Sequence, residues 1–342
     1  MRLWNKPAVL TAAGGIGFLL AARAVVQWWR EYDLRNQVVL ITGGSRGLGL
    51  VMARQLLQQG ARVAIGARDK AELERARGDL GQDEGRVLTV SCDISDREQA
   101  QAMVYDVQRH FGRIDVLINN AGTIQVGPVE LMTLEDYEAA MNVHFWGPLY
   151  TIFAVLPAMR QRRHGRIVNI SSIGGKVSVP HLLPYSASKF ALVGLSEGLR
   201  AELAKDGIIV TTVCPGLMRT GSPRNAFFKG QHRAEYTWFS ISDALPLVSQ
   251  SAERAAHQII TACKRGDAEV VLSLPAKLAT LVHDLFPGWT ADVLGLVNTL
   301  LLPGPDGIGT AHLPGKYSSS PLSPSWLTTL NDSAAQRNNE NA

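Results

Sequence analysis

The stretch Thr42-Gly-Gly-Ser-Arg-Gly-Leu-Gly49 decides the fold of this chain. It follows an apolar, β-rich run over 38–42 and opens a helical pattern over 47–59. A pyrophosphate needs backbone N–H groups at close range, which glycine allows at a tight turn, and the positive end of a helix stabilises it. We therefore expect Gly43, Gly47 and Gly49 to form a dinucleotide-binding turn, although the spacing Gly-x3-Gly-x-Gly differs from the Gly-x-Gly-x2-Gly fingerprint.

Around this stretch, short β-rich runs alternate with helical patterns from Gln37 to about Ser273. The alternation predicts an α/β fold, a doubly wound, seven-stranded parallel sheet of the Rossmann kind that is flanked by helices. The strand runs are apolar without strict alternation, as in strands that are covered on both faces. The expected strands are Val38–Thr42, Arg62–Ala67, Arg86–Cys92, Val116–Asn119, Arg166–Ser171, Ile208–Cys214 and Glu269–Ser273. The expected helices include Gly47–Gln59, Arg97–Phe111 and Tyr185–Lys205.

The composition suits a globular protein with a substantial core, since 46% of the 342 residues are hydrophobic and 19% are charged. The formal net charge of +4 and the absence of a dense Lys/Arg block exclude a nucleic-acid-binding protein. The cysteines number 3 and lie far apart with no CxxC spacing, so we expect neither a disulfide framework nor a metal site.

Residues 1–35 form an N-terminal segment with an uncharged apolar run from Pro7 to Ala22, followed by Arg23 and the pair Trp28-Trp29. This pattern favours a membrane anchor, although the run is slightly shorter than the roughly 20 residues that a membrane-spanning helix needs. A cleaved signal peptide and a helix docked on the protein surface are the alternatives. We expect a membrane-associated protein whose catalytic domain faces the cytoplasm, where dinucleotide cofactors are kept.

Residues 36–274 are the expected catalytic domain, and two further segments follow it. Residues 275–303 are strongly apolar, and Pro287-Gly288 divides them into two short helices, neither long enough to span a membrane. These helices either pack on the core or lie against a bilayer or a partner. Residues 304–342 are rich in Gly, Pro and Ser and end in Asn-Asn-Glu-Asn-Ala, which predicts a disordered tail.

The end of the second strand indicates which dinucleotide binds. An acidic side chain there would accept hydrogen bonds from a ribose 2′-OH, but the sequence has Ala67 followed by Arg68. Arg46 in the glycine turn lies on the same side, and two guanidinium groups can bind a 2′-phosphate. We expect NADP(H), with Asp69 either the acid after a one-residue shift or the N-cap of the next helix.

The run Tyr185-Ser-Ala-Ser-Lys189 indicates a proton donor. A carbonyl that accepts hydride develops negative charge on oxygen and needs a donor within hydrogen-bond reach. Lys189 stands one helical turn from Tyr185, so its ammonium, together with a positive nicotinamide, is expected to lower the pKa of the tyrosine. Ser172 follows a strand at its carboxyl end, where open α/β sheets bind ligands.

As a set, these motifs resemble the short-chain dehydrogenase/reductase superfamily in its single-domain Rossmann form, over about residues 37–273. The resemblance implies a catalytic tetrad in which Asn142 positions a water that links Lys189 to solvent, with Pro148 fitting a locally bent helix and His144 a bystander. It assigns Ser172 rather than Ser171, by the family's spacing to the tyrosine. The cofactor-binding residues that the resemblance and the glycine turn imply are Gly43, Ser45, Arg46, Gly47, Leu48, Gly49, Arg68, Asp93, Ile94, Asn120, Ala121, Gly122, Tyr185, Lys189, Pro215, Gly216 and Thr220.

The expected function is NADP(H)-dependent hydride transfer between nicotinamide and a carbonyl or secondary alcohol. Substrate choice in such enzymes resides after the sixth strand, where about 217–249 contain Phe227, Phe228, Tyr236, Trp238 and Phe239. These aromatic residues either favour an apolar, lipid-like small-molecule substrate or only pack against the C-terminal helices. The alternatives are a nucleotide-sugar epimerase or dehydratase and a non-catalytic NADP(H)-binding scaffold or redox sensor. The resemblance also implies a homodimer or homotetramer that pairs through the helices of Asn142 and Tyr185.

Overall fold

The computed structural model describes residues 31–81, 85–245, 248–320, 323, 325 and 328–340. Residues 1–30 of the expected membrane anchor lie outside the described residues, so this prediction stays a prediction.

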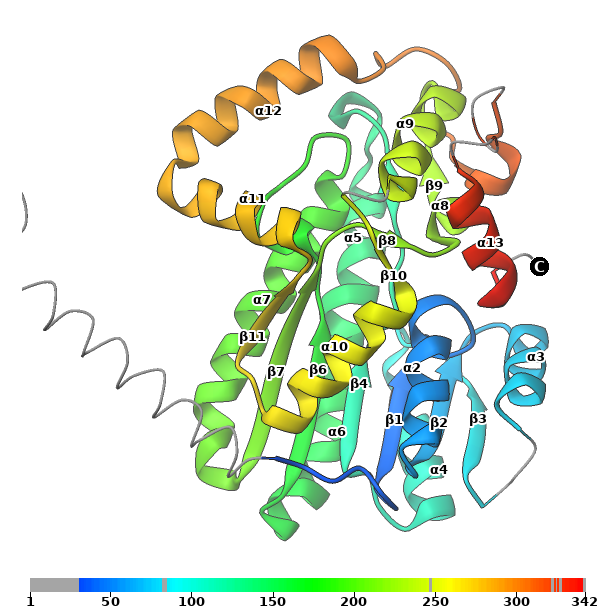
Figure 1. The fold of residues 1–342 in the computed structure, drawn as a ribbon, viewed down its shortest axis with the longest axis vertical. Helices are drawn as coiled ribbons and strands as arrows, with labels where there is room; N and C mark the ends of the chain where they lie inside the picture. The colour runs from blue at the N-terminus through cyan, green and yellow to red at the C-terminus, as the bar shows by residue number, and fades with distance from the viewer. Residues whose placement is uncertain are drawn as a thin grey trace, which may run out of the picture.

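A seven-stranded sheet forms the centre of the described chain, in the order β11-β7-β6-β4-β1-β2-β3 (Figure 1). All of its neighbouring strands run parallel, which confirms the predicted doubly wound sheet. Each strand begins and ends within about one residue of its expected bounds, apart from small extensions. The strands are β1 (Val38–Thr42), β2 (Arg62–Ala67), β3 (Val87–Ser91), β4 (Val116–Asn119), β6 (Gly165–Ile170), β7 (Ile208–Pro215) and β11 (Glu269–Leu272).

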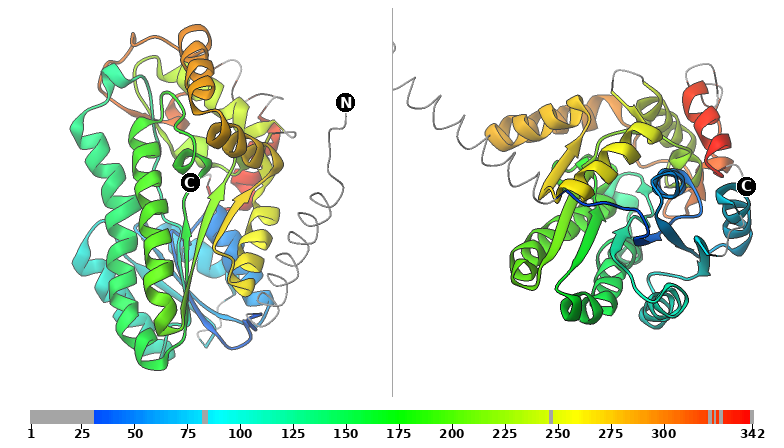
Figure 2. Two further views of the ribbon diagram at one scale, coloured as in Figure 1. Left: turned by 90° about the vertical axis from the view of Figure 1, so that its left-hand side faces the viewer. Right: turned by 60° about the horizontal axis from the view of Figure 1, so that its bottom comes forward.

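Helices cover both faces of this sheet (Figures 1 and 2). One core lies under α2 (Gly47–Gln58), α3 (Lys70–Leu80) and α10 (Ala252–Arg265), and a second core lies under α4 (Arg97–Phe111), α6 (Gly147–Arg162) and α7 (Leu183–Leu203). Successive residues of β1 are buried on opposite faces of the sheet: Leu40 lies in the core under α4, α6 and α7, and Ile41 lies in the core under α2, α3 and α10. Strands covered in this way are apolar at every position, which is why their sequence does not alternate.

A π-helix interrupts the longest helical stretch. The helix α5 (Leu134–Met141) continues through the π-helical residues Asn142–Trp146 into α6. A local irregularity was expected here, because Pro148 fits a locally bent helix. By length and composition the stretch Leu134–Arg162, of mean hydropathy 1.2, could cross a membrane. However, α6 buries Ile152, Val155 and Met159 against the sheet. We therefore interpret this stretch as a core helix.

Small elements cover the edge of the sheet at which its strands end. A three-stranded sheet joins β5 (Gln125–Val126), β9 (Phe227–Phe228) and β12 (Leu313–Pro314), and β8 (Met218–Arg219) pairs with β10 (Gln250–Ser251). The helices α8 (Ser222–Asn225), α9 (His232–Ala244) and α13 (Thr329–Arg337) lie around them. Short 3-10 turns occur at Val129–Leu131, Ile173–Gly175, Ala204–Asp206 and Gly315–Tyr317.

The expected disorder of residues 304–342 is wrong for the described part of this segment. Strand β12 pairs with β9, and α13 packs against α9 and β8. The side chains of Asn331 and Ala335 in α13 are buried, and the Asn331 amide donates to the Ser240 carbonyl oxygen at 3.2 Å. The composition is polar, but side-chain hydrogen bonds to distant backbone hold the segment in place.

Two apolar helices, α11 (Leu274–Leu285) and α12 (Pro287–Leu301), confirm the predicted division at Pro287. They stand away from the sheet, at the end where its strands end (Figure 1, orange). Ala276 is the one buried residue in α11, and α12 has none. Of the two expectations for these helices, packing on the core does not occur in the described chain.

Candidate active site

The glycine turn between β1 and α2 has the geometry that the sequence predicted. Gly43 and Gly47 have φ of +65° and +54°, a region that residues with a Cβ rarely adopt. A Cβ on Gly49 would lie 2.2 Å from the Gly43 carbonyl oxygen, so close approach also requires glycine there. The turn therefore presents backbone and the beginning of α2 in the geometry that suits a phosphate, and these residues fit a dinucleotide cofactor.

The loop after β4 supports this turn. The backbone N–H groups of Asn120 and Ala121 donate to Thr42 Oγ1 at 3.0 and 3.1 Å. The Asn120 side-chain amide donates to the carbonyl oxygens of Thr42 and Gly43 at 3.1 and 3.0 Å. Asn120 therefore fixes the shape of the turn, and Ala121 and Gly122 follow it in the same loop.

Three of the four predicted catalytic residues meet at the carboxyl end of β6. Tyr185, in the first turn of α7, forms a hydrogen bond with Ser172. Ser172 Oγ also accepts from the Gly174 N–H at 3.0 Å. Lys189 Nζ donates to the Ile170 carbonyl oxygen at 2.9 Å and lies 5.6 Å from the centre of the Tyr185 ring. The structure thus brings Ser172, Tyr185 and Lys189 together.

Burial is the main influence on the pKa values of Tyr185 and Lys189. It raises the pKa of Tyr185 to about 12, against a lowering contribution from the Ser172 hydrogen bond. It also lowers the pKa of Lys189 to about 7. The expected lowering of the tyrosine pKa by Lys189 is therefore not found in the chain without cofactor, because removal from water disfavours both charged forms.

The expected role of Asn142 does not agree with the geometry. The π-helix leaves the Asn142 side chain exposed, and its backbone carbonyl oxygen accepts from the Gly147 N–H. His144, which the sequence analysis set aside, is instead fully buried, with its ring 5.4 Å from the Tyr185 ring in an edge-to-face contact. A π-helix adds a residue to one turn and so changes which side chain faces the interior.

The hydrogen bonds of His144 define its tautomer. The Ser188 hydroxyl donates to the Tyr185 carbonyl oxygen at 2.8 Å, so its oxygen accepts from His144 Nδ1 at 2.7 Å. His144 Nε2 accepts from the Thr123 N–H at 3.1 Å. Burial, followed by the charge of Lys189, holds the pKa of His144 well below its ordinary value. His144 is therefore a neutral bridge between the helix of Tyr185 and the loop after Gly122.

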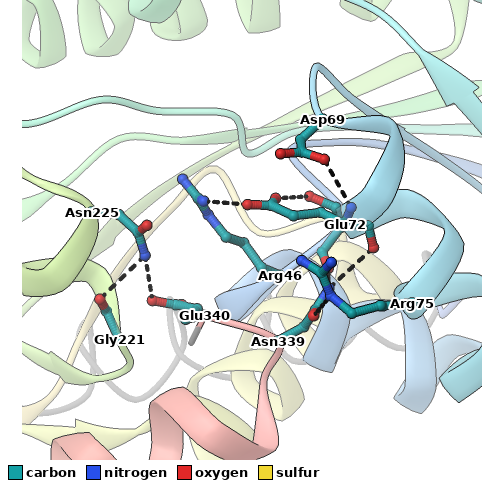
Figure 3. Close-up of polar contacts among 9 residues, drawn as sticks. Arg46, Asp69, Glu72, Arg75, Gly221, Asn225, Asn339 and Glu340 are labelled. Atoms are coloured by element: carbon teal, nitrogen blue, oxygen red, sulfur yellow. Dashed lines mark hydrogen bonds and ion pairs between the residues drawn. The ribbon is translucent and has the colours of Figure 1, made fainter. Parts of the chain in front are cut away.

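Arg46 and Arg68 lie near the expected adenosine end of the groove, each with an acidic neighbour. Arg46 Nη1 binds Glu72 at 2.6 Å, and the Ser45 hydroxyl donates to the same carboxylate at 2.9 Å (Figure 3). Arg68 is 68% exposed, with Nη1 3.9 Å from Asp93. A phosphate on this side would share Arg46 with Glu72, a carboxylate that the sequence analysis missed.

The remaining predicted residues line the other side of the groove or lie beneath it. Asp93 accepts from the Ser95 N–H at 2.9 Å, and Ile94 is buried against Gly147. Pro215 ends β7, and a Cβ on Gly216 would lie 2.7 Å from Ser273 Oγ. The Thr220 hydroxyl donates to Ser222 Oγ at 2.9 Å. Leu48 is buried in α2.

Comparison with known proteins identifies the family. The model of the family described as short chain dehydrogenase matches residues 37–228. The chain belongs to the short-chain dehydrogenase family. A dehydrogenase/reductase SDR family protein 7-like of Anopheles gambiae is 37% identical over 70% of this chain and 76% of its own length. Dehydrogenase/reductase SDR family member 7B of Bos taurus is 32% identical over 83% of this chain and 88% of its own length.

Solved structures agree with this assignment. A short-chain dehydrogenase from Streptomyces avermitilis superposes with a TM-score of 0.65 and 31% identity, covering 77% of this chain and 95% of its own. A 3-ketoacyl-(acyl-carrier-protein) reductase from Brucella melitensis, complexed with NADH, gives a TM-score of 0.62 at 26% identity, covering 70% and 97%. This chain is therefore an oxidoreductase of the short-chain dehydrogenase family, which binds a nicotinamide cofactor.

The C-terminal segment of this short-chain dehydrogenase contacts the glycine turn. The Gly47 N–H donates to the Asn338 carbonyl oxygen at 2.9 Å, and the Asn339 amide donates to the Ser45 carbonyl oxygen at 2.9 Å. The Asn225 amide donates to Glu340 at 3.3 Å (Figure 3). Nothing in the polar sequence Asn338-Asn-Glu340 signalled this position.

Two buried acids accompany this segment. Burial raises the pKa of Glu340 to about 7. It raises the pKa of Asp243, in α9, to about 8, and the negative charge of Glu340 adds to the effect. Asp243 in turn raises the pKa of Tyr185, which means that this acid lies within electrostatic range of the tyrosine.

Proposed function

We propose that the chain transfers a hydride between NADP(H) and a carbonyl or secondary alcohol, with Tyr185 as the proton donor and acceptor. The observation that carries this proposal is the hydrogen-bonded pair Tyr185–Ser172 beside Lys189, at the carboxyl edge of the sheet that also bears the glycine turn. Open α/β sheets bind their ligands at this edge.

A bound nicotinamide would supply or accept the hydride, and the residues of this chain would manage the oxygen and its proton. The Ser172 hydroxyl would hold the substrate oxygen, because it lies beside Tyr185 and its oxygen accepts from the Gly174 N–H. Tyr185 would donate its proton to the oxygen as negative charge develops there. With its pKa raised to about 12 by burial, Tyr185 is protonated at neutral pH and has a proton to donate.

Two neighbours would keep Tyr185 in position. Lys189 holds the end of β6 through Ile170 and would stabilise the phenolate that remains after proton transfer, when its amine is protonated. His144 contacts the Tyr185 ring and joins α7, through Ser188, to the Thr123 backbone. We propose His144, in place of Asn142, as the residue of the π-helix that serves this site.

The preference for NADP(H) is supported by charge. Ala67 ends β2 where an acid would bind a ribose 2′-OH, and Arg46 and Arg68 lie beside this end of the strand. The Asp69 side chain accepts from the Glu72 N–H at 2.9 Å and serves as the N-cap of α3. Glu72 already neutralises part of the charge of Arg46, so Arg68 would carry more of the phosphate recognition.

An apolar substrate is supported by a cluster of aromatic side chains. Phe228, Tyr236 and Phe239 are buried together with Leu182, and Tyr185 packs against this cluster. The solved relatives differ in substrate, since one is a 3-ketoacyl-(acyl-carrier-protein) reductase and another, from Gluconobacter frateurii, is an L-sorbose reductase complexed with NADPH and L-sorbose. The surroundings of Tyr185 in this chain favour a lipid-like carbonyl.

Membrane association is supported by α11 and α12 in addition to the N-terminal segment. Their exposed large apolar side chains are Leu274, Leu278, Leu281, Leu285, Phe286, Trp289, Val293, Leu296, Leu300 and Leu301. A continuous apolar surface of this kind is rare on soluble monomers and is typical of interaction with a membrane or another protein. We propose that it lies on the bilayer, with the catalytic domain on the cytoplasmic side.

A dimer through the long helices is supported by exposed aromatic side chains on them. Trp146, Phe153 and Phe190 project from the π-helix, α6 and α7, the helices through which such enzymes were expected to pair. Light scattering of the purified protein should then give twice the protomer mass of 37.1 kDa, whereas a monomer would contradict this arrangement.

The substitution Tyr185→Phe tests the proposed reaction. We expect loss of NADPH-dependent reduction across a panel of aldehydes and ketones by at least about a thousandfold, within the range that acid catalysis and alignment contribute. NADPH affinity, measured by calorimetry, should remain within about twofold, because the hydroxyl is not needed to hold the phosphates. Retained turnover in this variant would refute the assignment of the proton donor.

A further inference from the structure

The C-terminal residues Asn338, Asn339 and Glu340 lie on the groups that a cofactor would use. The Gly47 N–H, at the beginning of α2, donates to the Asn338 carbonyl oxygen at 2.9 Å. This N–H is one of the groups at a helix beginning that have no partner inside the helix, and it is a natural donor to phosphate. In this structure the chain itself takes that donor.

Glu340 fills the groove between the glycine turn and the segment after β7. A Cβ placed on Gly47 would lie 2.3 Å from one oxygen of its carboxyl group, and a Cβ on Gly221 would lie 2.4 Å from the other. Glycine at both positions thus leaves the space that the carboxyl group occupies. The Asn225 amide donates to it at 3.3 Å (Figure 3).

The charges around Glu340 are of both signs, so they stabilise its carboxylate only partly. Arg46 and Arg224 attract its carboxylate, whereas Glu72 and Asp243 oppose it. A pyrophosphate carries more negative charge than one carboxyl group and would gain more from the same arginines and from the beginning of α2. The site can therefore exchange one anion for the other.

The adenosine side of the groove is covered as well. The Asn339 amide donates to the carbonyl oxygens of Ser45 and Glu72 at 2.9 and 3.0 Å, and Arg75 donates to the Asn339 side-chain oxygen at 2.8 Å (Figure 3). These partners flank Arg46, where the 2′-phosphate is proposed to bind. A three-residue segment thus extends from the residues proposed to bind the 2′-phosphate to the glycine turn proposed to bind the pyrophosphate.

The segment is anchored where it leaves α13. Arg54 donates to the Asn338 side-chain oxygen at 2.9 Å and to the Arg337 carbonyl oxygen at 2.8 Å. The Glu340 N–H donates to the Ala335 carbonyl oxygen at 2.9 Å. Since α13 is held independently against α9, residues 338–340 can leave the groove without unfolding the helix.

We propose that residues 338–340 are a built-in competitor that occupies the cofactor groove and must leave before NADP(H) binds. This rests on the proposed function in that the glycine turn must hold the phosphates of the cofactor. Cofactor and segment exclude each other because both need the Gly47 N–H and the space beside Gly221. The apparent affinity for cofactor is then reduced by the fraction of molecules in which the segment is docked.

Calorimetric titration with NADPH tests the proposal on the full chain, on a chain that ends at Arg337, and on Glu340→Ala. We expect the shortened chain to bind about tenfold more tightly, which corresponds to about 1.4 kcal/mol, and Glu340→Ala to show an intermediate gain. Gln336→Ala is the matched control, since Gln336 is exposed in the last turn of α13, and its affinity should equal that of the full chain. Glu340→Ala keeps the full length and decides the question if the shortened chain does not fold.

Hydrogen exchange on the full chain gives a readout that does not depend on affinity. Saturating NADPH should increase exchange at the backbone amide of Glu340, whose hydrogen bond to the Ala335 carbonyl oxygen lies beyond the last residue of α13 and breaks on release. Equal affinity in the full and shortened chains, or increased protection of 338–340 with NADPH, would overturn the proposal. A shortened chain that binds no NADPH would contradict the proposed function instead.

Discussion

The substitution His144→Phe tests whether a buried, neutral imidazole supports the catalytic tyrosine. Phenylalanine keeps a ring against Tyr185 but removes both hydrogen bonds of His144. The Thr123 N–H then loses its partner in a partly buried place, at a cost of about 1–3 kcal/mol, and the bond to Ser188 contributes about 1 kcal/mol more. At pH 8 we expect the free energy of unfolding to fall by about 2–4 kcal/mol.

The pH dependence separates this role from ordinary packing. Burial holds the pKa of His144 well below 6.5, so the native state keeps it neutral while the unfolded chain takes up a proton in acid. A base whose pKa is lower in the native state than in the unfolded state leaves the protein at full stability when the pH is above the unfolded-state pKa. The protein loses stability as the pH falls below that value. At pH 5 the natural protein therefore loses stability through His144 that the variant, which has no such group, keeps. The difference in stability between the two proteins should shrink from pH 8 to pH 5.

Urea unfolding of both proteins at the two pH values, followed by tryptophan fluorescence, measures this difference. The other titrating groups are common to both proteins and cancel. His257→Phe, at an exposed position of α10, is the control, and its effect should not depend on pH. A destabilisation by His144→Phe that is equal at pH 5 and pH 8 would refute the assignment of a neutral histidine.

Three further predictions concern cofactor, substrate and membrane. Arg68→Ala should raise the KM for NADPH by about tenfold through loss of charge-assisted hydrogen bonds, with the KM for NADH within about twofold, and an equal loss with both cofactors would count against a 2′-phosphate contact. Across ketones of graded chain length, kcat/KM should rise by up to about fourfold for each added CH2 that becomes buried, whereas a flat series would exclude a lipid-like substrate. In a chain that lacks residues 1–30, replacing Leu296 and Leu300 by Asp should reduce flotation with phospholipid vesicles by about tenfold or more, because each exposed leucine contributes about 1.5–3 kcal/mol when buried in lipid. Unchanged flotation would show that α12 does not contact the bilayer.

The central sheet was predictable because its signal is local. A strand that is covered on both faces, such as β1, is a short apolar run that ends at glycine, and its bounds follow from the sequence alone. The position of Tyr185 relative to Lys189 follows from helical spacing in the same way. The division of the apolar C-terminal segment at Pro287 needed only the helix-breaking property of proline.

The site residues that the sequence analysis missed are positioned by tertiary geometry, which no local sequence pattern encodes. Asn142 was assigned from the family resemblance, but the π-helix at Asn142–Trp146 places the His144 side chain against Tyr185. One signal was available, since His144 is the only polar residue in the apolar run 143–146. The docking of residues 338–340 depends on backbone groups about 290 residues away, so a polar run gave no sign of it.

The pairing of β12 with β9 determines where this protein can be shortened for expression. The matched family region ends at Phe228, yet Phe228 is fully buried and its strand pairs with Leu313. Gly315 N–H also donates to the Ala226 carbonyl oxygen at 2.8 Å. Cutting the chain at the Pro-rich stretch near residue 303 would uncover an aromatic surface beside Tyr185, and an insoluble product would then reflect the choice of boundary.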